Sequence, residues 1–165
     1  MDILTETKHL QNRLDDLRNS QMSIGLVPTM GYLHDGHLSL IRKARSENDA
    51  VVTTIFVNPL QFAETEDLDT YPTDIEKDTF LASEAGTDLL FTPTNEEMFC
   101  DDVLTTVSVQ EISTVLEGAS RPTHFSGVAT IVAKLFNIVG VCTAYFGEKD
   151  CLLYTSDAAD DGYRV

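Results

Sequence analysis

Apolar positions along the first part of the chain alternate between helical spacing and short unbroken runs. A charged segment carries leucines at i, i+4 and i+7, at Leu10, Leu14 and Leu17, which predicts an amphipathic helix. The apolar run 24–27 and the run 51–57, which is rich in β-branched residues, are typical of buried strands. A second helix is predicted between these runs by apolar residues at helical spacing, namely Leu38, Ile41 and Ala44.

The succession of strand, helix and strand implies two parallel strands joined by a right-handed crossover. Ligands of such folds bind beyond the carboxyl ends of the strands. In this chain, residues 28–37 and 58–62 are the two loops at that position. We therefore expect an α/β fold with a doubly wound, mainly parallel sheet of the Rossmann-like kind, and a ligand site at these two loops.

The next segment predicts a further helix and strand. Thr73 and Glu76 have the spacing of a capping box, which predicts a helix that runs through Ala85 with Gly86 in the C′ position. A third strand is expected within residues 88–92.

Two more strands are predicted in the last third of the chain, at residues 105–109 and 143–146. A strongly apolar helix lies between them. No internal repeat or low-complexity tract interrupts the alternation, so a single domain is expected over residues 1–150. The apolar positions of the helix are Val128, Ile131, Val132, Leu135, Phe136 and Val139.

Composition excludes several classes of partner. The formal net charge of −16 repels phosphate backbones and no run of Lys and Arg offsets it, so we exclude nucleic acid as the main partner. The start of the chain has no apolar signal region and no stretch is long enough to span a bilayer, so we expect a cytoplasmic protein without a membrane partner. Reduced thiols are predicted, because the cysteines are odd in number and far apart, at Cys100, Cys142 and Cys151.

Candidate chemistry is concentrated in the sequence His34-Asp35-Gly36-His37, between a predicted strand and the start of a predicted helix. The unpaired N–H groups and the positive dipole end of a helix favour bound phosphate there, and a glycine lets the backbone approach the anion. Two imidazoles can donate hydrogen bonds to phosphate oxygens and stabilise charge during nucleotidyl transfer. The alternatives are two surface or capping histidines, or a metal pair. No third ligand lies nearby in the style of HExxH, which disfavours the metal.

Four sequence blocks resemble the pantothenate synthetase family. Residues 27–37 read VPTMGYLHDGH, which resembles the family signature, a version of the HxGH motif of the nucleotidyltransferase superfamily. Residues 55–62 read IFVNPLQF, residues 116–128 read LEGASRPTHFSGV, and residues 146–150 read FGEKD. The blocks follow one another in the family's order, and the resemblance covers residues 4–150.

The resemblance implies an ATP site and assigns catalytic roles within it. His34, His37 and Lys149 are its catalytic residues, and Lys149 faces the phosphates as a mobile charge. Mg²⁺ accompanies ATP as part of the substrate, and its protein ligands stay unassigned. The residues that the resemblance places against ATP are Met30, Gly31, Tyr32, Leu33, His34, Asp35, Gly36, His37, Gly147, Glu148, Lys149 and Asp150.

The second block implies a site for the other substrates. Asn58 and Gln61 match the residues that hold pantoate in the family, although Leu60 stands where methionine is more usual. Because an amide both donates and accepts, Gln61 could orient both pantoate and β-alanine. The alternative for Gln61 is a solvent-exposed turn residue. For Arg121 and His124 we expect a bracing role ahead of the apolar helix, rather than contact with substrate.

The function implied by the resemblance is that of an AMP-forming pantoate–β-alanine ligase. The carboxylate of (R)-pantoate attacks the α-phosphorus of Mg-ATP and expels diphosphate. The β-alanine amine then attacks the pantoyl-adenylate, which releases AMP and yields pantothenate, a precursor of coenzyme A. The family also implies a homodimer for the full-length protein.

The resemblance ends after residue 150. We expect residues 1–150 to form an incomplete nucleotide- and pantoate-binding domain, and residues 151–165, which resemble a translated adapter sequence, to be a tail without function. The family's Ser-Ser-Arg loop and lid domain have no counterpart here, so we expect little or no turnover. Two alternatives stay open. One is an HxGH nucleotidyltransferase with another acceptor, which the second block argues against, and the other is a non-catalytic nucleotide-binding or pairing module.

Overall fold

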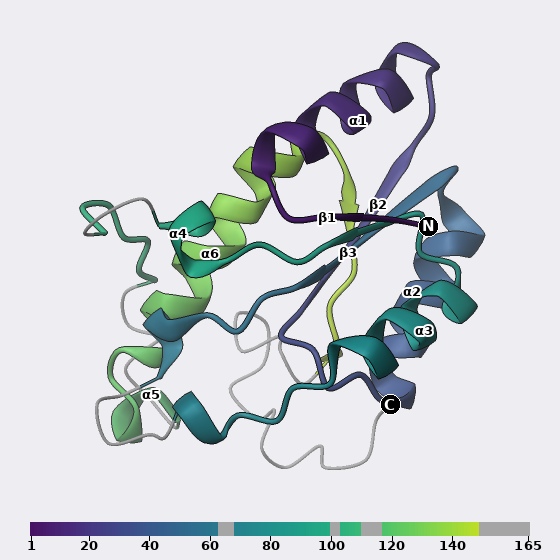
Figure 1. Ribbon diagram of the computed structural model, residues 1–165. Coiled ribbons are helices and arrows are strands. Elements are labelled where there is room, and N and C mark those ends of the chain that lie inside the picture. Colours follow the sequence, from purple (N-terminus) through teal and green to yellow (C-terminus); the bar gives the residue numbers. More distant parts are fainter. Residues whose placement is uncertain (63–67, 100–102, 110–116, 149–165) are drawn as a thin grey trace.

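A parallel five-stranded sheet lies at the centre of the computed structural model, within the residues that it describes: 1–62, 68–99, 103–109 and 117–148 (Figure 1). The strand order is β1-β4-β3-β2-β5, and each neighbouring pair runs parallel. This confirms the predicted α/β class with a mainly parallel sheet. The strands are β1 (Asp2–Leu4), β2 (Ile24–Thr29), β3 (Ala50–Ile55), β4 (Leu89–Phe91) and β5 (Thr143–Ala144).

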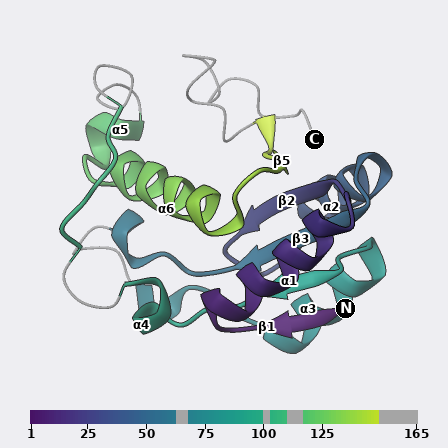
Figure 2. The same ribbon diagram turned by 90° about the horizontal axis from the view of Figure 1, so that it is seen from above.

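Helices cover both faces of the sheet (Figures 1 and 2). On one face, Leu10 of α1 and Leu135 of α6 share an apolar cluster with Leu26 of β2. On the other face, α2 and α3 form a second cluster with Val27. Adjacent side chains of a strand point to opposite faces, which is why Leu26 and Val27 enter different clusters. The helices are α1 (Thr7–Asn19), α2 (Asp35–Glu47), α3 (Ile75–Ala85), α4 (Asn95–Met98), α5 (Glu117–Ser120) and α6 (His124–Val139), with the 3₁₀ turns η1 (Pro59–Gln61) and η2 (Leu68–Thr70).

The predicted strand–helix–strand unit is confirmed as β2, α2 and β3, with the six residues of β2 paired in register with the six of β3. The strand β1 was not predicted. It has only three residues, and two of them are exposed, so its sequence carries no apolar run. The segment forms a strand because it pairs with β4 at the edge of the sheet, which is a tertiary contact.

The strand predicted at residues 105–109 is wrong, because residues 103–109 form no strand. The backbone N–H of Val107 instead donates to the Thr130 hydroxyl oxygen at 2.9 Å, on helix α6. A side chain thus satisfies the peptide group that a neighbouring strand would otherwise bind. The strand predicted at 143–146 is confirmed in part: β5 pairs only Thr143 and Ala144 with β2, and the Tyr145 N–H adds one bond to the Leu26 carbonyl.

The start of α3 differs from the predicted capping box. Asp74, and not Thr73, is the N-cap residue, and its carboxylate accepts a hydrogen bond from the Lys77 N–H at 3.1 Å. The end of α3 is as expected. Gly86 follows it in the left-handed conformation with φ of 108°, where a β-carbon would be strained.

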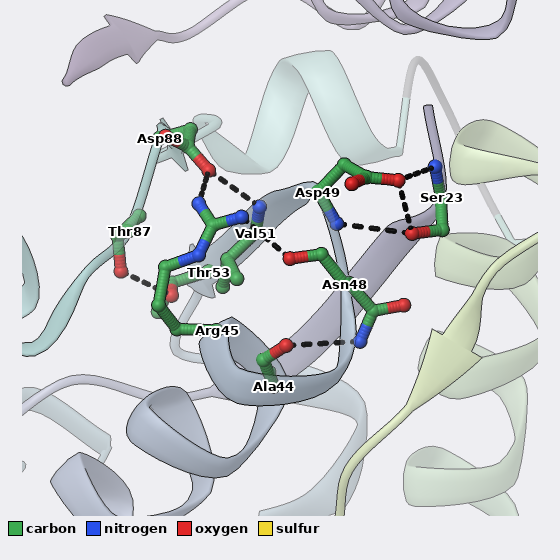
Figure 3. A network of polar contacts seen from close by, with 9 residues as sticks. All are labelled: Ser23, Ala44, Arg45, Asn48, Asp49, Val51, Thr53, Thr87 and Asp88. Carbon is green, nitrogen blue, oxygen red and sulfur yellow. Dashed lines mark hydrogen bonds and ion pairs between the residues drawn. The ribbon is translucent and has the colours of Figure 1, made fainter. Parts of the chain in front are cut away.

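A polar network at the amino ends of the strands fixes the C-terminal end of α2 (Figure 3). The Asp88 carboxylate accepts hydrogen bonds from the Arg45 guanidinium and from the Val51 N–H. Arg45 also donates to the Asn48 carbonyl at the C-cap of α2. Because this network anchors the last turn of α2 at the amino edge of the sheet, the first turn of α2 lies at the carboxyl edge.

Several expectations concern residues outside the described part of the chain. They are the roles of Lys149 and Asp150 and the nature of residues 151–165. Of the cysteines, Cys142 is described as a half-buried free thiol, and burial raises its pKa. In the described residues, no helix combines the length and the apolar character needed to cross a bilayer.

Candidate functional site

The carboxyl ends of three neighbouring strands carry most of the predicted site residues. The last residue of β2 lies opposite the last residue of β3, Thr29 beside Ile55, so the two strands end together (Figure 1). The loop before α2 follows β2, η1 follows β3, and the segment with Gly147 follows β5. The structure therefore brings the first two motif blocks to one edge of the sheet, as a parallel sheet requires.

Both histidines of the first block cap helix α2. Nδ1 of His34 accepts a hydrogen bond from the Gly36 N–H at 3.1 Å, and Nδ1 of His37 accepts one from the His34 N–H at 3.4 Å. Their ring centroids lie 4.1 Å apart. The capping role that we considered as an alternative is thus observed, and it defines the orientation of both rings.

This capping geometry also sets the chemistry that each ring can perform. A ring nitrogen that accepts a hydrogen bond carries no proton, so each neutral imidazole has its proton on Nε2. Both rings, His34 and His37, then carry an Nε2–H donor at the N-terminus of α2. The helix dipole adds positive potential at the same place. Two donors and a helix N-terminus together suit an anionic ligand such as a phosphate.

The turn that leads into α2 has an unusual backbone. Gly31 and Tyr32 both have positive φ, 86° and 51°. For a tyrosine this is a strained conformation. The carboxylate of Asp78, on helix α3, accepts hydrogen bonds from the N–H groups of Tyr32 and Leu33, each at 2.7 Å.

Sequence reasoning missed Asp78. The residue is buried, with 1% of its surface exposed, and lies on the core face of α3 with Ala82 and Ala85 at i+4 and i+7. A carboxylate in an apolar stripe was the available signal, because a buried charge requires partners.

The second block forms η1, and its two polar residues are both buried. Asn58 caps η1 by accepting from the Leu60 N–H at 3.2 Å, and it donates to the Gly127 carbonyl and to the Gln61 side-chain oxygen, each at 3.1 Å. Gln61 is only 8% exposed, so the solvent-exposed alternative for this residue is wrong. The side-chain N–H of Gln61 points to the sulfur of Met30 at 2.9 Å, which links the two motif blocks.

The third block holds the backbone of η1 in place. Nδ1 of His124 lies 2.9 Å from the Gln61 carbonyl oxygen, and the Arg121 guanidinium donates to the same oxygen at 3.3 Å. Since a carbonyl can only accept, His124 must carry a proton on Nδ1. These contacts fit the bracing role that we expected for Arg121 and His124.

The end of β5 is tied to α2 through a tyrosine. The Tyr145 hydroxyl donates to the Glu47 carboxylate at 2.9 Å and accepts from the Asn48 side chain at 2.7 Å. Burial, and then the bond to Glu47, raise the pKa of Tyr145. Beyond it lie Gly147, half-buried, and Glu148, exposed.

Metal ligands are not evident in this arrangement. Among the described residues, no three or more His, Cys, Asp and Glu side chains gather closely enough to hold a metal ion. In the histidine pair, both Nδ1 atoms accept backbone hydrogen bonds, and the expectation that this pair is not a metal pair stays a prediction.

Known proteins resemble this chain over most of its length. A family model described as Pantoate-beta-alanine ligase matches residues 2–155. Pantothenate synthetase of Rhizobium johnstonii is 53% identical over 150 residues, which are 91% of this chain and 50% of that protein. Pantothenate synthetase of Bacillus cereus is 54% identical over 150 residues, with 91% and 53% covered. This chain thus spans about half the length of these relatives.

Solved structures agree with the sequence relatives. Pantothenate synthetase from Thermus thermophilus superposes with a TM-score of 0.86 at 48% identity, over 92% of this chain and 54% of that one. The ligase from Francisella tularensis, solved in complex with Beta-gamma ATP and Beta-alanine, has a TM-score of 0.87 at 43% identity, over 92% and 58%. On the family match, the sequence identity and the shared fold, this chain belongs to the pantoate–beta-alanine ligase family.

Proposed function

We propose that this chain provides the nucleotide- and pantoate-binding part of a pantothenate synthetase. The reaction condenses (R)-pantoate with β-alanine through pantoyl-adenylate, consumes ATP, and yields pantothenate, AMP and diphosphate. One observation carries the proposal: the side chain of Gln61 reaches the sulfur of Met30 at 2.9 Å, so the turn before the histidines and the amide of η1 are in direct contact. The ligands of the Francisella tularensis enzyme, Beta-gamma ATP and Beta-alanine, support this assignment.

ATP binds, in this proposal, at the N-terminus of α2. His34 and His37 donate from Nε2 to phosphate oxygens, while their Nδ1 atoms keep the helix capped. Residues 30–33 and the segment with Gly147 and Glu148 contact the nucleoside. Lys149 and Asp150 complete this site, with the ammonium of Lys149 near the α-phosphate.

The metal requirement of the proposal follows from charge. Attack of a carboxylate on a phosphate brings two anions together, and Mg²⁺ supplies positive charge to the phosphate oxygens when it is bound. Mg²⁺ commonly keeps several waters and binds through substrate phosphates with only one or two carboxylates. The lack of a ligand cluster in the described residues is compatible with an ion that arrives with ATP.

Pantoate binds through Gln61. A thioether sulfur is a weak acceptor, so the Gln61 amide loses little when it exchanges Met30 for a carboxylate or hydroxyl oxygen of pantoate. Asn58 is 1% exposed, and its amide is bonded to Leu60, Gly127 and Gln61. We therefore assign Asn58 to the pantoate site as the residue that orients Gln61. β-Alanine follows pantoate to the same amide.

The full-length protein is proposed to act as a cytoplasmic homodimer, as the family resemblance implies. This chain spans about half the length of its relatives, and we propose that it binds the substrates. Product analysis separates the alternatives. Pantothenate with AMP supports the ligase, a nucleotidylated alcohol supports a transferase with another acceptor, and binding without either product supports a binding module.

Calorimetric titration of Mg-ATP, followed by pantoate, tests the proposal directly. The unmodified chain is expected to release or absorb heat with both ligands. His37→Ala should lose the Mg-ATP signal, and Gln61→Ala should lose the pantoate signal. The matched control is His9→Ala, because His9 is an exposed histidine on α1, remote in sequence from the site. Absence of any heat from the unmodified chain would argue against the proposed function.

A further inference from the structure

We propose that Asp78 is a positioning residue for nucleotide binding, which acts by holding the backbone of the turn before α2. This inference rests on the proposed function, because it assumes that the turn contacts ATP. Asp78 is 1% exposed, so its carboxylate is not available to a ligand in solution. Any effect on ATP must therefore pass through the groups that Asp78 contacts.

Those groups are two consecutive backbone N–H donors. One carboxylate oxygen of Asp78 accepts from Tyr32 and the other from Leu33, each at 2.7 Å. Two short charge-assisted bonds to successive peptides determine the orientation of both peptide planes. Leu33 immediately precedes His34, the N-cap of α2. The orientation of these two peptide planes therefore sets the path of the backbone as it enters the helix at the histidine pair.

The contact also explains how the turn keeps a strained conformation. Tyr32 has φ of 51°, which L-residues adopt at a cost unless the surroundings hold them. Lys77, next to Asp78 on α3, places its ammonium 5.8 Å from the centroid of the exposed Tyr32 ring. The first turn of α3 thus holds Tyr32 through both its backbone and its ring.

The Asp78 carboxylate also packs closely against Gly31. A β-carbon built on Gly31 would lie 3.0 Å from an Asp78 oxygen and 3.0 Å from the Ile55 side chain. Burial, and then the charge of Asp78, raise the pKa of Tyr71. None of the ion pairs among the described residues involves Asp78, so the backbone N–H groups are the main compensation for its charge.

The test compares Asp78→Asn with Glu84→Gln, which removes the same charge from an exposed position of α3. Asparagine has one acceptor oxygen and turns an N–H₂ group toward the second donor. We expect the Tyr32 and Leu33 amides of Asp78→Asn to lose protection from hydrogen exchange, measured by NMR on the ligand-free chain. We further expect the Kd for Mg-ATP to rise about tenfold or more, which is the scale of one lost charge-assisted bond. The Kd for pantoate, which we propose binds at Gln61, should not change. Glu84→Gln should change none of these quantities.

A second variant disturbs the same contact from the side of the loop. Gly31→Ala leaves α3 intact but places a methyl against the Asp78 carboxylate, so it should weaken Mg-ATP binding in the same way. Its control is Gly86→Ala, which introduces alanine at a similarly positive φ of 108° after α3 and should leave the Kd for Mg-ATP unchanged. Because Gly31 is itself placed against ATP, hydrogen exchange of the Tyr32 and Leu33 amides in ligand-free Gly31→Ala must also increase if the loss of affinity acts through the contact with Asp78. Unchanged protection of these amides would overturn the positioning role even if Asp78→Asn does not fold.

The outcomes separate the two proposals. If the unmodified chain binds Mg-ATP and the folded Asp78→Asn or Gly31→Ala variant binds it equally well, the positioning role is wrong and the proposed function stands. If affinity is lost for Mg-ATP and pantoate alike, together with a lower melting temperature, Asp78 stabilises the fold as a whole and the positioning role is wrong. If the unmodified chain does not bind Mg-ATP at all, the proposed function fails first and the inference fails with it.

Discussion

The backbone of Gly127 in α6 lies so close to Leu60 in η1 that no side chain fits between them. A β-carbon at position 127 would lie 2.3 Å from the Leu60 carbonyl oxygen, a backbone atom that cannot move without displacing η1. Asn58 bonds to the Gly127 carbonyl at 3.1 Å, so helix and turn are also joined by a hydrogen bond. Gln61, which we propose binds pantoate, is the last residue of this turn.

Gly127→Ala is therefore expected to destabilise the protein. Helix propensity alone favours alanine over glycine by about 1 kcal/mol in a helix interior. Overpacking against fixed backbone costs about 1–3 kcal/mol, so the net change in unfolding free energy should be destabilising. Urea denaturation measures it, with Ser126→Ala as the control at the neighbouring position. A more stable Gly127→Ala variant would contradict the close contact.

His124→Ala is expected to weaken pantoate binding without removing a group that touches substrate. The variant loses the hydrogen bond from Nδ1 to the Gln61 carbonyl, a contribution of about 1 kcal/mol, or roughly a fivefold rise in the Kd for pantoate. His124→Asn places an amide N–H₂ near the position of Nδ1 and should restore most of the affinity. Calorimetric titration compares the three proteins. Equal loss in both variants would point instead to direct contact between the imidazole and substrate.

Asp74→Ala is expected to reduce stability by about 1 kcal/mol, the usual cost of removing an N-cap side chain. The reason is the bond that Asp74 accepts from the Lys77 N–H. Thr73→Ala, the adjacent exposed position, should be close to neutral. Thermal denaturation of both variants measures the difference. If Thr73→Ala is the less stable variant, Thr73 and not Asp74 caps the helix.

The contribution of Glu97 to stability is expected to depend on pH. Its carboxylate accepts from the Thr7 N–H at 2.8 Å, at the first residue of α1, and this bond lowers the pKa of Glu97 below its usual 4.5. A lowered pKa in the folded state gives stability that is present above pH 4.5 and is lost as the pH falls through the folded-state pKa. Glu97→Gln keeps an acceptor oxygen but removes the charge.

Denaturation of the unmodified chain and of Glu97→Gln should therefore differ at about pH 7 and converge below the folded-state pKa of Glu97. Glu84→Gln serves as the control for loss of one exposed acidic charge. A difference between the unmodified chain and Glu97→Gln that stays constant down to acid pH would show that the charge is not what stabilises the start of α1.

Much of the fold could be predicted from local pattern. The periodicity of Leu38, Ile41 and Ala44 located α2, and the flanking apolar runs located β2 and β3, because burial of one face leaves a period in the sequence. The positions of the first two loops followed from the rule for parallel strands. The strand at 105–109 failed for the converse reason. Its β-branched residues were compatible with a strand, but the Thr130 hydroxyl bound the backbone of Val107 instead.

By itself, the sequence determined the α/β alternation, the two loops at the carboxyl ends of β2 and β3, and the motif residues within them. Only the tertiary structure decided the strand order, the strand β1, and the partners of the motif residues: Asp78 for the turn at Tyr32, and Arg121 and His124 for the carbonyl of Gln61. The physical reason is range. Periodicity records whether a position is buried, whereas a hydrogen bond between residues 46 or 63 positions apart depends on how whole helices pack on the sheet.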